Sequence, residues 1–225
     1  MAFGSIAVDA RGPIQRWPAV SMLTGLLGNA LGLRRTDSAA LDRLQERLRW
    51  AARIDREGDY LFDFQTAELS SADQGWTTRG VPEGRKGGAP TYASPHLRYR
   101  EYTADASVLV ALRLEPEAES PTLDDLAEAA QRPQRPLFIG RKACLPAVPL
   151  YAGLIAATDA VDALRLAPWS CPPPAKATVF FPTGESLIPL LTQHHATDRR
   201  RFDVDVHVGS EVICEAQVPV AGAPS

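Results

Sequence analysis

The chain has 225 residues, which is enough for one large domain or two small ones with a buried core. Hydrophobic residues make up 45% and charged residues 23% of the sequence, as in ordinary globular proteins. The formal net charge of −3 excludes a polycation, so any contact with nucleic acid has to come from a local basic patch.

The sequence contains no targeting signal, membrane segment or metal motif. Its apolar runs are shorter than the ~20 residues of a membrane span, and the N-terminus lacks the basic and apolar regions of a signal peptide. We therefore expect a cytoplasmic protein without membrane contact. Cys144, Cys171 and Cys214 are odd in number and lack CxxC spacing, which predicts reduced thiols, no disulfide and no zinc site.

The first part of the chain predicts one strand and two helices. Residues 4–10 alternate weakly between apolar and polar and predict a strand, which the turn at 11–13 ends. Ser21 is the predicted N-cap of a helix that ends near residue 33. A second helix with an apolar leucine stripe is predicted over 38–50. Its arginines, which we interpret as a solvated face, are Arg43, Arg47 and Arg49.

Three glycines, Gly25, Gly28 and Gly32, lie on or near one face of the first predicted helix. Glycine within a helix costs about 1 kcal/mol relative to alanine, so their presence predicts that another element packs very close to this face. That element is the sheet or, alternatively, the backbone of a ligand.

Strands are predicted over 51–54 and 60–66, and the excursion that follows over 70–114 is too long for a passive turn. Its first part is rich in glycine and carries the cations Arg79, Arg85 and Lys86. Residues 98–102 then alternate cations with aromatic rings, and residues 106–114 have the apolar, β-branched composition of a buried strand. A core strand that follows a basic, aromatic arm predicts a surface that binds an anion.

A further helix is predicted over about 120–132, because Ser120 or Thr122 can cap it and Asp124 and Asp125 favour its first turn. The order of elements up to this point predicts an α+β fold, with a ferredoxin-like or RRM-like domain and an elaborated central hairpin. We place this domain at residues 1–138 and a smaller β-rich annex at 139–225. The strands predicted in the annex are 178–181, 202–208 and 211–218.

A basic turn is predicted near the end of the first domain. Gly140 turns the chain and presents Arg141 and Lys142, and such a turn can offer backbone amides and positive charge to a phosphate. An ordinary basic turn explains these residues equally well.

Groups for catalysis are scattered along the chain. His194 and His195 are adjacent, so on a strand they point to opposite faces and are poor joint ligands. His96, together with Tyr99 or Tyr102 and with Lys142, could form a metal-free ribonuclease site, in which histidine and tyrosine transfer protons and lysine stabilises charge.

The alternation within residues 98–102 is a stronger signal, and it favours RNA binding. Arginines can bind phosphates bidentately, and aromatic rings can stack on unpaired bases. The RRM consensus of the Lys/Arg-Gly-Phe type is absent from the sequence, so the signal rests on composition and alternation alone.

Three blocks of residues carry a family resemblance. All three resemble parts of CasD-type subunits. The first helix of these subunits is matched by Met22–Gly32, and their thumb with its following strand by Asp63–Thr66 and Arg100–Ala106. A third block of these subunits is matched by Arg135–Gly153. These subunits belong to the RAMP superfamily and to the type I-E CRISPR surveillance complex, Cascade. The blocks span most of residues 4–155, whereas the C-terminal part of the chain matches only loosely.

This resemblance implies a ferredoxin-like core with a protruding β-hairpin thumb at about 67–97. It implies a non-catalytic subunit that holds the 5′ handle of the CRISPR RNA and caps the backbone of the complex in antiviral defence. The implied partners are a backbone subunit of the RAMP class, the large PAM-recognising subunit and, through the complex, target DNA; no cofactor is implied. The related subunit of type I-C systems is the pre-crRNA endoribonuclease, so a metal-independent nuclease is the alternative.

The sequence departs from the family pattern in two places. The segment between the first strand and the first helix is short, so some handle contacts are missing or come from Arg11 and Arg16. Gln65 stands where the family's Asp-aromatic-His-Thr motif has histidine, which removes a titratable group at the base of the thumb. The candidate RNA-binding residues are Arg11, Arg16, Ser21, Arg79, Arg85, Lys86, Arg98, Arg100, Tyr102, Arg141 and Lys142.

Overall fold

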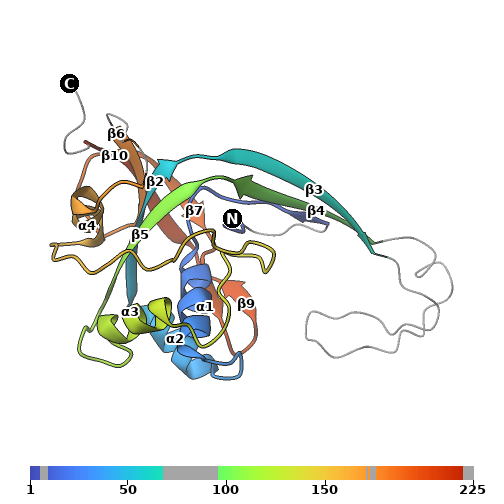
Figure 1. The fold of residues 1–225 in the computed structure, drawn as a ribbon, viewed down its shortest axis with the longest axis horizontal. Helices are drawn as coiled ribbons and strands as arrows, with labels where there is room; N and C mark the ends of the chain where they lie inside the picture. Colours follow the sequence, from blue (N-terminus) through green and yellow to red (C-terminus); the bar gives the residue numbers. More distant parts are fainter. Residues whose placement is uncertain (6–9, 68–95, 171, 173–175, 220–225) are drawn as a thin grey trace.

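The computed structural model describes residues 1–5, 10–67, 96–170, 172 and 176–219, and Figure 1 draws the other residues in grey. The helices are α1 (Val20–Leu31), α2 (Ser38–Arg47), α3 (Leu123–Gln131) and α4 (Ala160–Leu166). The strands are β1 (Arg11–Gly12), β2 (Leu48–Arg56), β3 (Asp59–Ala67), β4 (His96–Ala104), β5 (Ser107–Leu114), β6 (Lys176–Pro182), β7 (Leu190–Ala196), β8 (Arg199–Arg201), β9 (Val206–Val208) and β10 (Glu211–Pro219). The predicted α+β class is confirmed. None of the described helices is long and apolar enough to cross a membrane.

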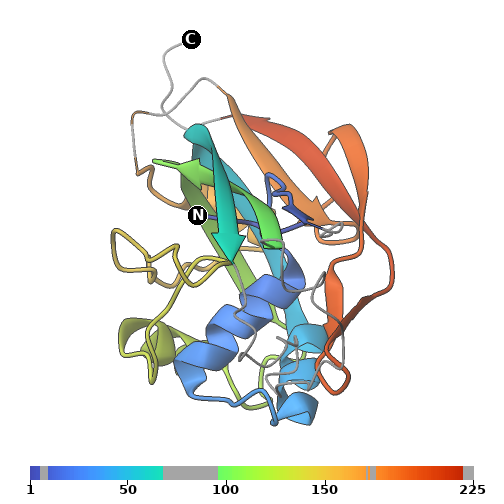
Figure 2. The same ribbon diagram turned by 90° about the vertical axis from the view of Figure 1, so that its right-hand side faces the viewer.

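A five-stranded sheet in the order β5-β2-β6-β10-β7 forms the body of the protein, and its neighbouring strands are antiparallel. Trp50 and Ala52 of β2 pack with residues of α1, α2 and α3, whereas Ala51 packs with α4. Because side chains alternate along a strand, these two clusters lie on opposite faces of the sheet. Helices therefore cover the sheet on both sides (Figures 1 and 2).

Strands from both predicted regions of the chain share this sheet. β2 pairs with β6, with Ala52 opposite Phe180 and Arg53 opposite Val179. The C-terminal region is rich in strands. Three of them, β6, β7 and β10, extend the main sheet of the N-terminal region, and β8 and β9 form a separate pair. The domain boundary at residue 138 stays a prediction.

The structure corrects several predicted boundaries. α1 begins at Val20 with Ala19 as its N-cap, so Ser21 is not the cap and lies buried in the first turn. The second helix ends at Arg47, because the residues that follow enter the buried sheet as β2. The predicted turn at 11–13 contains β1, and most of the strand predicted over 4–10 lies outside the described residues. The strand predicted over 202–208 is wrong, because residues 202–205 form the turn between the paired strands β8 and β9. α4 and β7 are elements that the sequence did not predict.

The close neighbour predicted for the glycine face of α1 is another helix. A Cβ added to Gly28 would lie 2.6 Å from Leu41 Cδ2 of α2, so neither the sheet nor a ligand explains this glycine. Gly32 has a φ of +83° and ends α1 in a left-handed C-cap. Gly25 has open space around its Cβ position and imposes no packing requirement.

The start of α3 confirms the predicted capping. Thr122 Oγ1 accepts a hydrogen bond from the Asp125 N–H at 3.2 Å, and the Asp125 carboxylate accepts one from the Thr122 N–H at 2.7 Å. This capping box satisfies two of the free amides of the first turn. The same hydrogen bonds to Thr122 hold the pKa of Asp125 below its usual value.

One two-stranded ribbon connects the core to a protruding hairpin. β2 and β5 form its inner half within the sheet, and β3 and β4 continue it outward (Figure 1). The ribbon bends at Gly58 and Asp105, whose φ angles of +75° and +50° are left-handed. Arg56 lies across this bend at the surface, where its Nε donates to the Asp105 carbonyl at 2.6 Å and its Nη2 to Asp105 Oδ1 at 2.8 Å. The predicted hairpin is confirmed, and residues 68–95 of the predicted thumb lie outside the described residues.

Two fully buried arginines pin loops to the body. Arg47 donates to the carbonyls of Pro116, Glu119 and Pro121, so its interpretation as part of a solvated face is wrong. Arg53 is equally buried on the α4 side of β2. Both guanidinium groups replace lost water contacts with hydrogen bonds to the protein, which is the condition for burying a charge.

The loop between β7 and β8 carries a buried carboxyl group. Asp198 is only 2% exposed, and its backbone carbonyl accepts from the Ser21 N–H at 3.3 Å. Burial, followed by the nearby Glu211 carboxylate, raises the pKa of Asp198 to about 7. Aspartate in an unfolded chain titrates near ~3.9, so the folded protein holds this proton more tightly than the unfolded chain does.

This difference in pKa predicts a pH-dependent stability. The free energy of unfolding of the native protein should fall as the pH rises from about 4 to about 7 and then level off, because folding then buries a charge. We expect Asp198→Asn to remove most of this slope and to be more stable than the native protein at pH 8, by about 2–4 kcal/mol. Urea denaturation at pH 5 and pH 8 measures the effect. The exposed acid Glu117, replaced by glutamine, serves as the control, and an unchanged slope in Asp198→Asn would contradict the assignment.

Candidate nucleic-acid interface

The base of the hairpin is a three-stranded sheet in the order β1-β4-β3. β1 pairs with β4 in parallel, which places Arg11 beside Tyr99 and Gly12 beside Arg100. β3 pairs with β4 in antiparallel register from Asp59 opposite Ala104 outward. Since successive side chains of a strand point to opposite sides, the hairpin has two faces, and their chemistry differs.

The first face, which we call the cationic face, carries Arg98, Arg100 and Tyr102 of β4. Arg98 and Arg100 each donate to a nearby backbone carbonyl, at 2.7 and 3.1 Å. Arg98 is exposed and Arg100 is half-buried. The predicted RNA-binding residues of β4 therefore lie on one side of one strand.

The second face, which we call the aromatic face, carries Phe62 and Phe64 of β3 and Tyr99 of β4. The Tyr99 ring centroid lies 5.6 Å from that of Phe62 and 5.3 Å from that of Phe64. The Arg11 guanidinium lies over the Tyr99 ring, 5.9 Å from its centroid. Arg11, unlike the other arginines of the hairpin base, is thus on the aromatic face.

The predicted turn at Gly140 brings Arg141 to the hairpin base. Gly140 has a φ of +81°, and an added Cβ would lie 1.8 Å from the Ala2 carbonyl oxygen. The Arg141 guanidinium donates to the Gly12 carbonyl at 2.6 Å and to the Glu101 carbonyl at 2.5 Å, and it lies 5.0 Å from the centroid of the Tyr102 ring. Its hydrogen bonds tie the 139–144 loop to β1 and β4. Lys142 is exposed beside it.

The remaining predicted residues are placed elsewhere. Arg16 forms ion pairs with Glu57 at 2.5 Å and Glu215 at 3.1 Å, and its guanidinium lies over the Phe180 ring. Ser21 is buried in the first turn of α1 and is not part of the hairpin base. The predicted cations Arg79, Arg85 and Lys86 lie outside the described residues.

Comparison with known proteins decides the family. A family model described as CRISPR-associated protein (Cas_Cas5) matches residues 1–211. The chain belongs to the Cas_Cas5 family.

A curated relative supports the assignment to the Cas_Cas5 family, and two solved structures have a similar fold. The CRISPR system Cascade subunit CasD of Escherichia coli (strain K12) is 31% identical over 163 residues, which cover 72% of this chain and 70% of that protein. The resemblance to CasD-type subunits is thereby confirmed. The fold is similar to a structure described as CRISPR RNA-guided surveillance complex, with a TM-score of 0.70 and 24% identity over 97% of this chain and 86% of that one. It is also similar to one described as Crystal structure of Cas protein, with a TM-score of 0.62 and 23% identity over 97% of this chain and 89% of that one.

The hydrogen bonds of Arg141 in this Cas_Cas5 protein should stabilise the fold, and this contribution can be measured separately from the effect of removing one positive charge. We expect Arg141→Met to destabilise the protein by about 2–3 kcal/mol, because two partly buried backbone carbonyls lose a charged donor. Lys142→Met, which removes the same charge one residue later from an exposed side chain, should change the free energy of unfolding by less than about 0.5 kcal/mol. Urea denaturation compares the two variants, and equal effects would contradict the structural role of Arg141.

The geometry of β4 bears on the catalytic alternative. His96 and Tyr102 are six residues apart on one strand, about 20 Å at ~3.3 Å per residue. Tyr99 and Tyr102 occupy positions of opposite parity, so the two tyrosines belong to different faces of the strand. Among the described residues, no group of three or more histidine, cysteine or acidic side chains is arranged to hold a metal ion.

Other groups singled out in the sequence have structural partners. His194 and His195 lie on β7, where the His194 ring is 2.8 Å from Glu215 Oε2 and His195 is exposed, as expected for adjacent residues of a strand. Cys144 and Cys214 are buried free thiols, and Cys171 lies outside the described residues.

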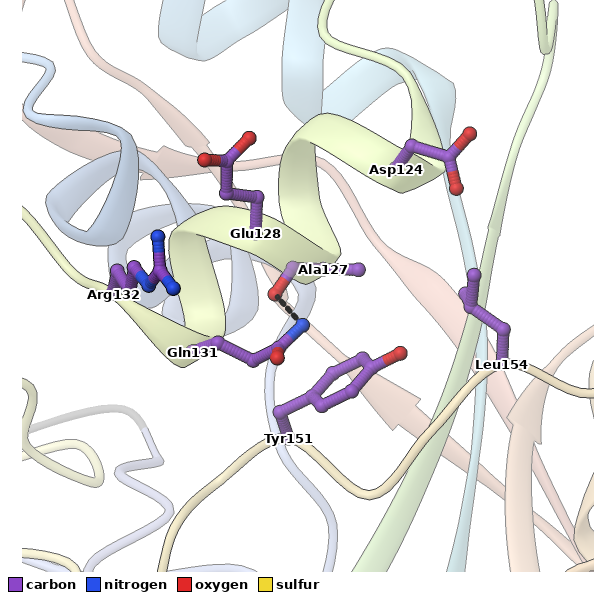
Figure 3. A pocket seen from close by; sticks show the side chains of 7 residues that line it. All are labelled: Asp124, Ala127, Glu128, Gln131, Arg132, Tyr151 and Leu154. Carbon is purple, nitrogen blue, oxygen red and sulfur yellow. Dashed lines mark hydrogen bonds between the residues drawn. The ribbon is translucent and has the colours of Figure 1, made fainter.

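A shallow pocket lies at α3, where the side chains of Tyr151 and Leu154 face the helix (Figure 3). Its volume is about 260 Å³, and the only hydrogen bond drawn within it runs from Gln131 Nε2 to the Ala127 carbonyl at 3.1 Å. The polar lining combines Asp124, Glu128 and Arg132, so no single charge dominates it. None of these residues belongs to the hairpin base.

Sequence reasoning missed the aromatic face of the hairpin. Phe62 and Phe64 are 56% and 52% exposed, and they lie across the ribbon from Tyr99. The available signal was the alternation at 60, 62 and 64, which places three rings on one side of a strand. The apolar side of an alternating strand is usually buried. The apolar side of β3 is exposed because the ribbon leaves the main sheet, which the sequence does not show.

Proposed function

We propose that this Cas_Cas5 protein is a non-catalytic RNA-binding subunit of a Cascade-type CRISPR surveillance complex in the cytoplasm. It holds the 5′ handle of the CRISPR RNA and caps the backbone of the complex. The observation that carries this proposal is the meeting of cations from three separate segments, β1, β4 and the 139–144 loop, at the base of a protruding hairpin.

The relatives support a place in such a complex. The Escherichia coli relative is named a Cascade subunit, and one structure of similar fold is described as an RNA-guided surveillance complex. The partners that we propose are a backbone subunit of the RAMP class along the hairpin, the large PAM-recognising subunit and, through the complex, target DNA. No cofactor, metal or membrane is required.

The cations at the hairpin base suit a phosphate backbone. Arg98 and Lys142 are exposed, and Arg100 is half-buried. Planar guanidinium groups can bind two phosphate oxygens at once. Arg141 holds the strands and the loop that carry these groups. Arg79, Arg85 and Lys86 belong to the same proposed interface through their place in the sequence between β3 and β4.

The nuclease alternative is weaker because of the geometry of β4. Proton transfer by His96 and a tyrosine requires both groups within hydrogen-bond reach of one ribose and its phosphate, whereas about 20 Å of strand separates His96 from Tyr102. The Gln65 side chain, at the position of the family's histidine, donates to Asp63 Oδ2 at 2.7 Å and cannot titrate in its place.

Co-purification tests the proposed function. The tagged chain is expressed with the CRISPR operon of its host, and the bound proteins and RNA are identified by mass spectrometry and RNA sequencing. We expect CRISPR subunits and guide RNA with an intact 5′ handle. The double variant Arg98→Glu/Arg100→Glu should lower RNA recovery and reduce the salt slope of binding by about 0.7 per lost phosphate contact.

Arg34→Glu is the matched charge control, because Arg34 is an exposed arginine of the α1–α2 connection, away from the hairpin base. It should leave RNA recovery unchanged. Failure of the native chain to recover CRISPR subunits or guide RNA would refute the proposed function. Cleavage of repeat RNA by the purified chain in EDTA, abolished by His96→Ala, would instead establish the nuclease.

A further inference from the structure

We propose that the aromatic face of the hairpin, Phe62, Phe64 and Tyr99 with Arg11 at its edge, is a stacking platform for unpaired RNA bases. This inference rests on the proposed function and adds which face of the hairpin meets the bases. The β4 residues that the sequence named as RNA contacts, Arg98, Arg100 and Tyr102, lie on the opposite, cationic face, whereas Arg11 lies on the aromatic face.

The aromatic face is assembled as a surface and not as a core. Tyr99 stands across the ribbon from both phenylalanines, and its ring is nearly parallel to that of Phe62, with an angle of 27° between their planes. The three rings thus form one continuous apolar strip on a part of the chain that has left the sheet. Apolar strips of this kind, when exposed, mark binding sites.

The charges on this face favour a nucleic acid over an apolar protein partner. The Arg11 guanidinium lies over the Tyr99 ring and, among the residues that the structure describes, makes no ion pair, so it is available to a phosphate. The carboxylate on this face, Glu101, accepts from the Ile14 N–H at 3.1 Å. It also raises the pKa of Tyr60 through a hydrogen bond, after the larger effect of desolvation. Its negative charge is therefore partly neutralised by protein donors.

Rings with an adjacent guanidinium match the chemistry of a single strand. Each unpaired base presents an apolar π-face, and the phosphate that follows it presents a negative charge. On the cationic face, by contrast, Arg141 covers the Tyr102 ring and is bonded to two carbonyls, so that ring is not free to stack. The two faces therefore bind different parts of the RNA. Bases stack on Phe62, Phe64 and Tyr99, and phosphates bind to Arg98 and Arg100.

The test uses the full chain and a defined probe, an eight-nucleotide single-stranded oligoadenylate that contains 2-aminopurine. We expect the native chain to quench the 2-aminopurine fluorescence, and Phe62→Ala/Phe64→Ala to remove the quenching and to weaken binding about tenfold or more. The salt slope of binding should stay unchanged in this variant, because no phosphate contact is lost. Arg11→Ala should lower that slope by about 0.7.

Leu61→Ala is the matched control, since Leu61 lies on the same strand, is 51% exposed and points to the cationic face. It should bind like the native chain. Phe62→Leu/Phe64→Leu keeps the apolar volume and guards against misfolding, and it should also lose the quenching. A probe of the same length with abasic sites should bind the native chain and the double alanine variant equally.

Two outcomes would overturn the platform. One is unchanged quenching and affinity in the double alanine variant. The other is loss of a protein subunit from the co-purified complex with unchanged affinity for the probe, which would make the face a protein-docking surface. Failure of the proposed function looks different, because the native chain itself would then recover no guide RNA, whereas failure of the platform leaves native RNA recovery intact.

Discussion

Replacing Arg53 with methionine is expected to lower the free energy of unfolding by about 3–5 kcal/mol, because it breaks a buried ion pair from one side only. The Arg53 Nε donates to Asp55 Oδ1 at 2.6 Å, and its Nη atoms donate to the carbonyls of Ala167 and Pro168 at 3.0 and 2.9 Å. Its guanidinium also lies 3.9 Å from the centroid of the Trp169 ring. Methionine supplies none of these donors. Asp55 would keep its hydrogen bonds from Ser170, but its charge would lose the cation that offsets its burial.

Urea denaturation followed by tryptophan fluorescence measures this loss. Arg56→Met is the matched control on the same strand, because the Arg56 side chain is 52% exposed and its ion pair with Asp105 is open to solvent. Exposed pairs contribute about 0–1 kcal/mol, so the two variants should differ by several-fold. A loss below about 1 kcal/mol in Arg53→Met would contradict the role of the guanidinium in joining β2 to the residues after α4.

Replacing Gly58 with valine is expected to cost at least about 2–3 kcal/mol and to misplace the hairpin. A Cβ at this position would lie 2.2 Å from the Ala104 carbonyl oxygen and 2.6 Å from the Ala106 nitrogen, both of which are backbone atoms. The left-handed φ of Gly58 adds strain for a β-branched residue. Since the ribbon bends here, the variant should lose hydrogen-exchange protection in β3 and β4 first, and RNA recovery with it.

Gly184→Val is the control that introduces backbone strain without a steric clash. Gly184 has a φ of +90°, but nothing lies within 4 Å of its Cβ position. This variant should show the conformational strain alone and keep the protection of β3 and β4. Equal losses of protection in the hairpin amides of both variants would show that close contact at the bend is not the cause.

Local signals predicted local features well. The capping residues of α3, the Gly140 turn and the strand that becomes β5 each depend on a few neighbouring residues, and the structure contains all three. The composition of the cationic face was also predictable, because strand alternation alone places Arg98, Arg100 and Tyr102 on one side of β4.

Features that depend on distant partners were not predictable in the same way. Arg47 and Arg53 look like surface arginines, and only the carbonyls of loops far along the chain explain why both are buried. Asp198 acquires its raised pKa from burial against elements that the sequence does not place. The ion pairs of Arg16 with Glu57 and Glu215 likewise depend on strands whose places the sequence does not give.

The two sides of the bend contribute equal numbers of residues, and this has a consequence for insertions and deletions. Arg56 pairs with Ser107 on the inner side and Asp59 with Ala104 on the outer side, so two residues of each strand form the turn between them. Loss of one residue from each strand would shift both by one position and exchange the two faces of the hairpin relative to the core. Loss of two from each would restore the original facing. Length variation in this ribbon among related proteins should therefore occur in matched steps of two, because only even changes keep the aromatic and cationic faces on their own sides.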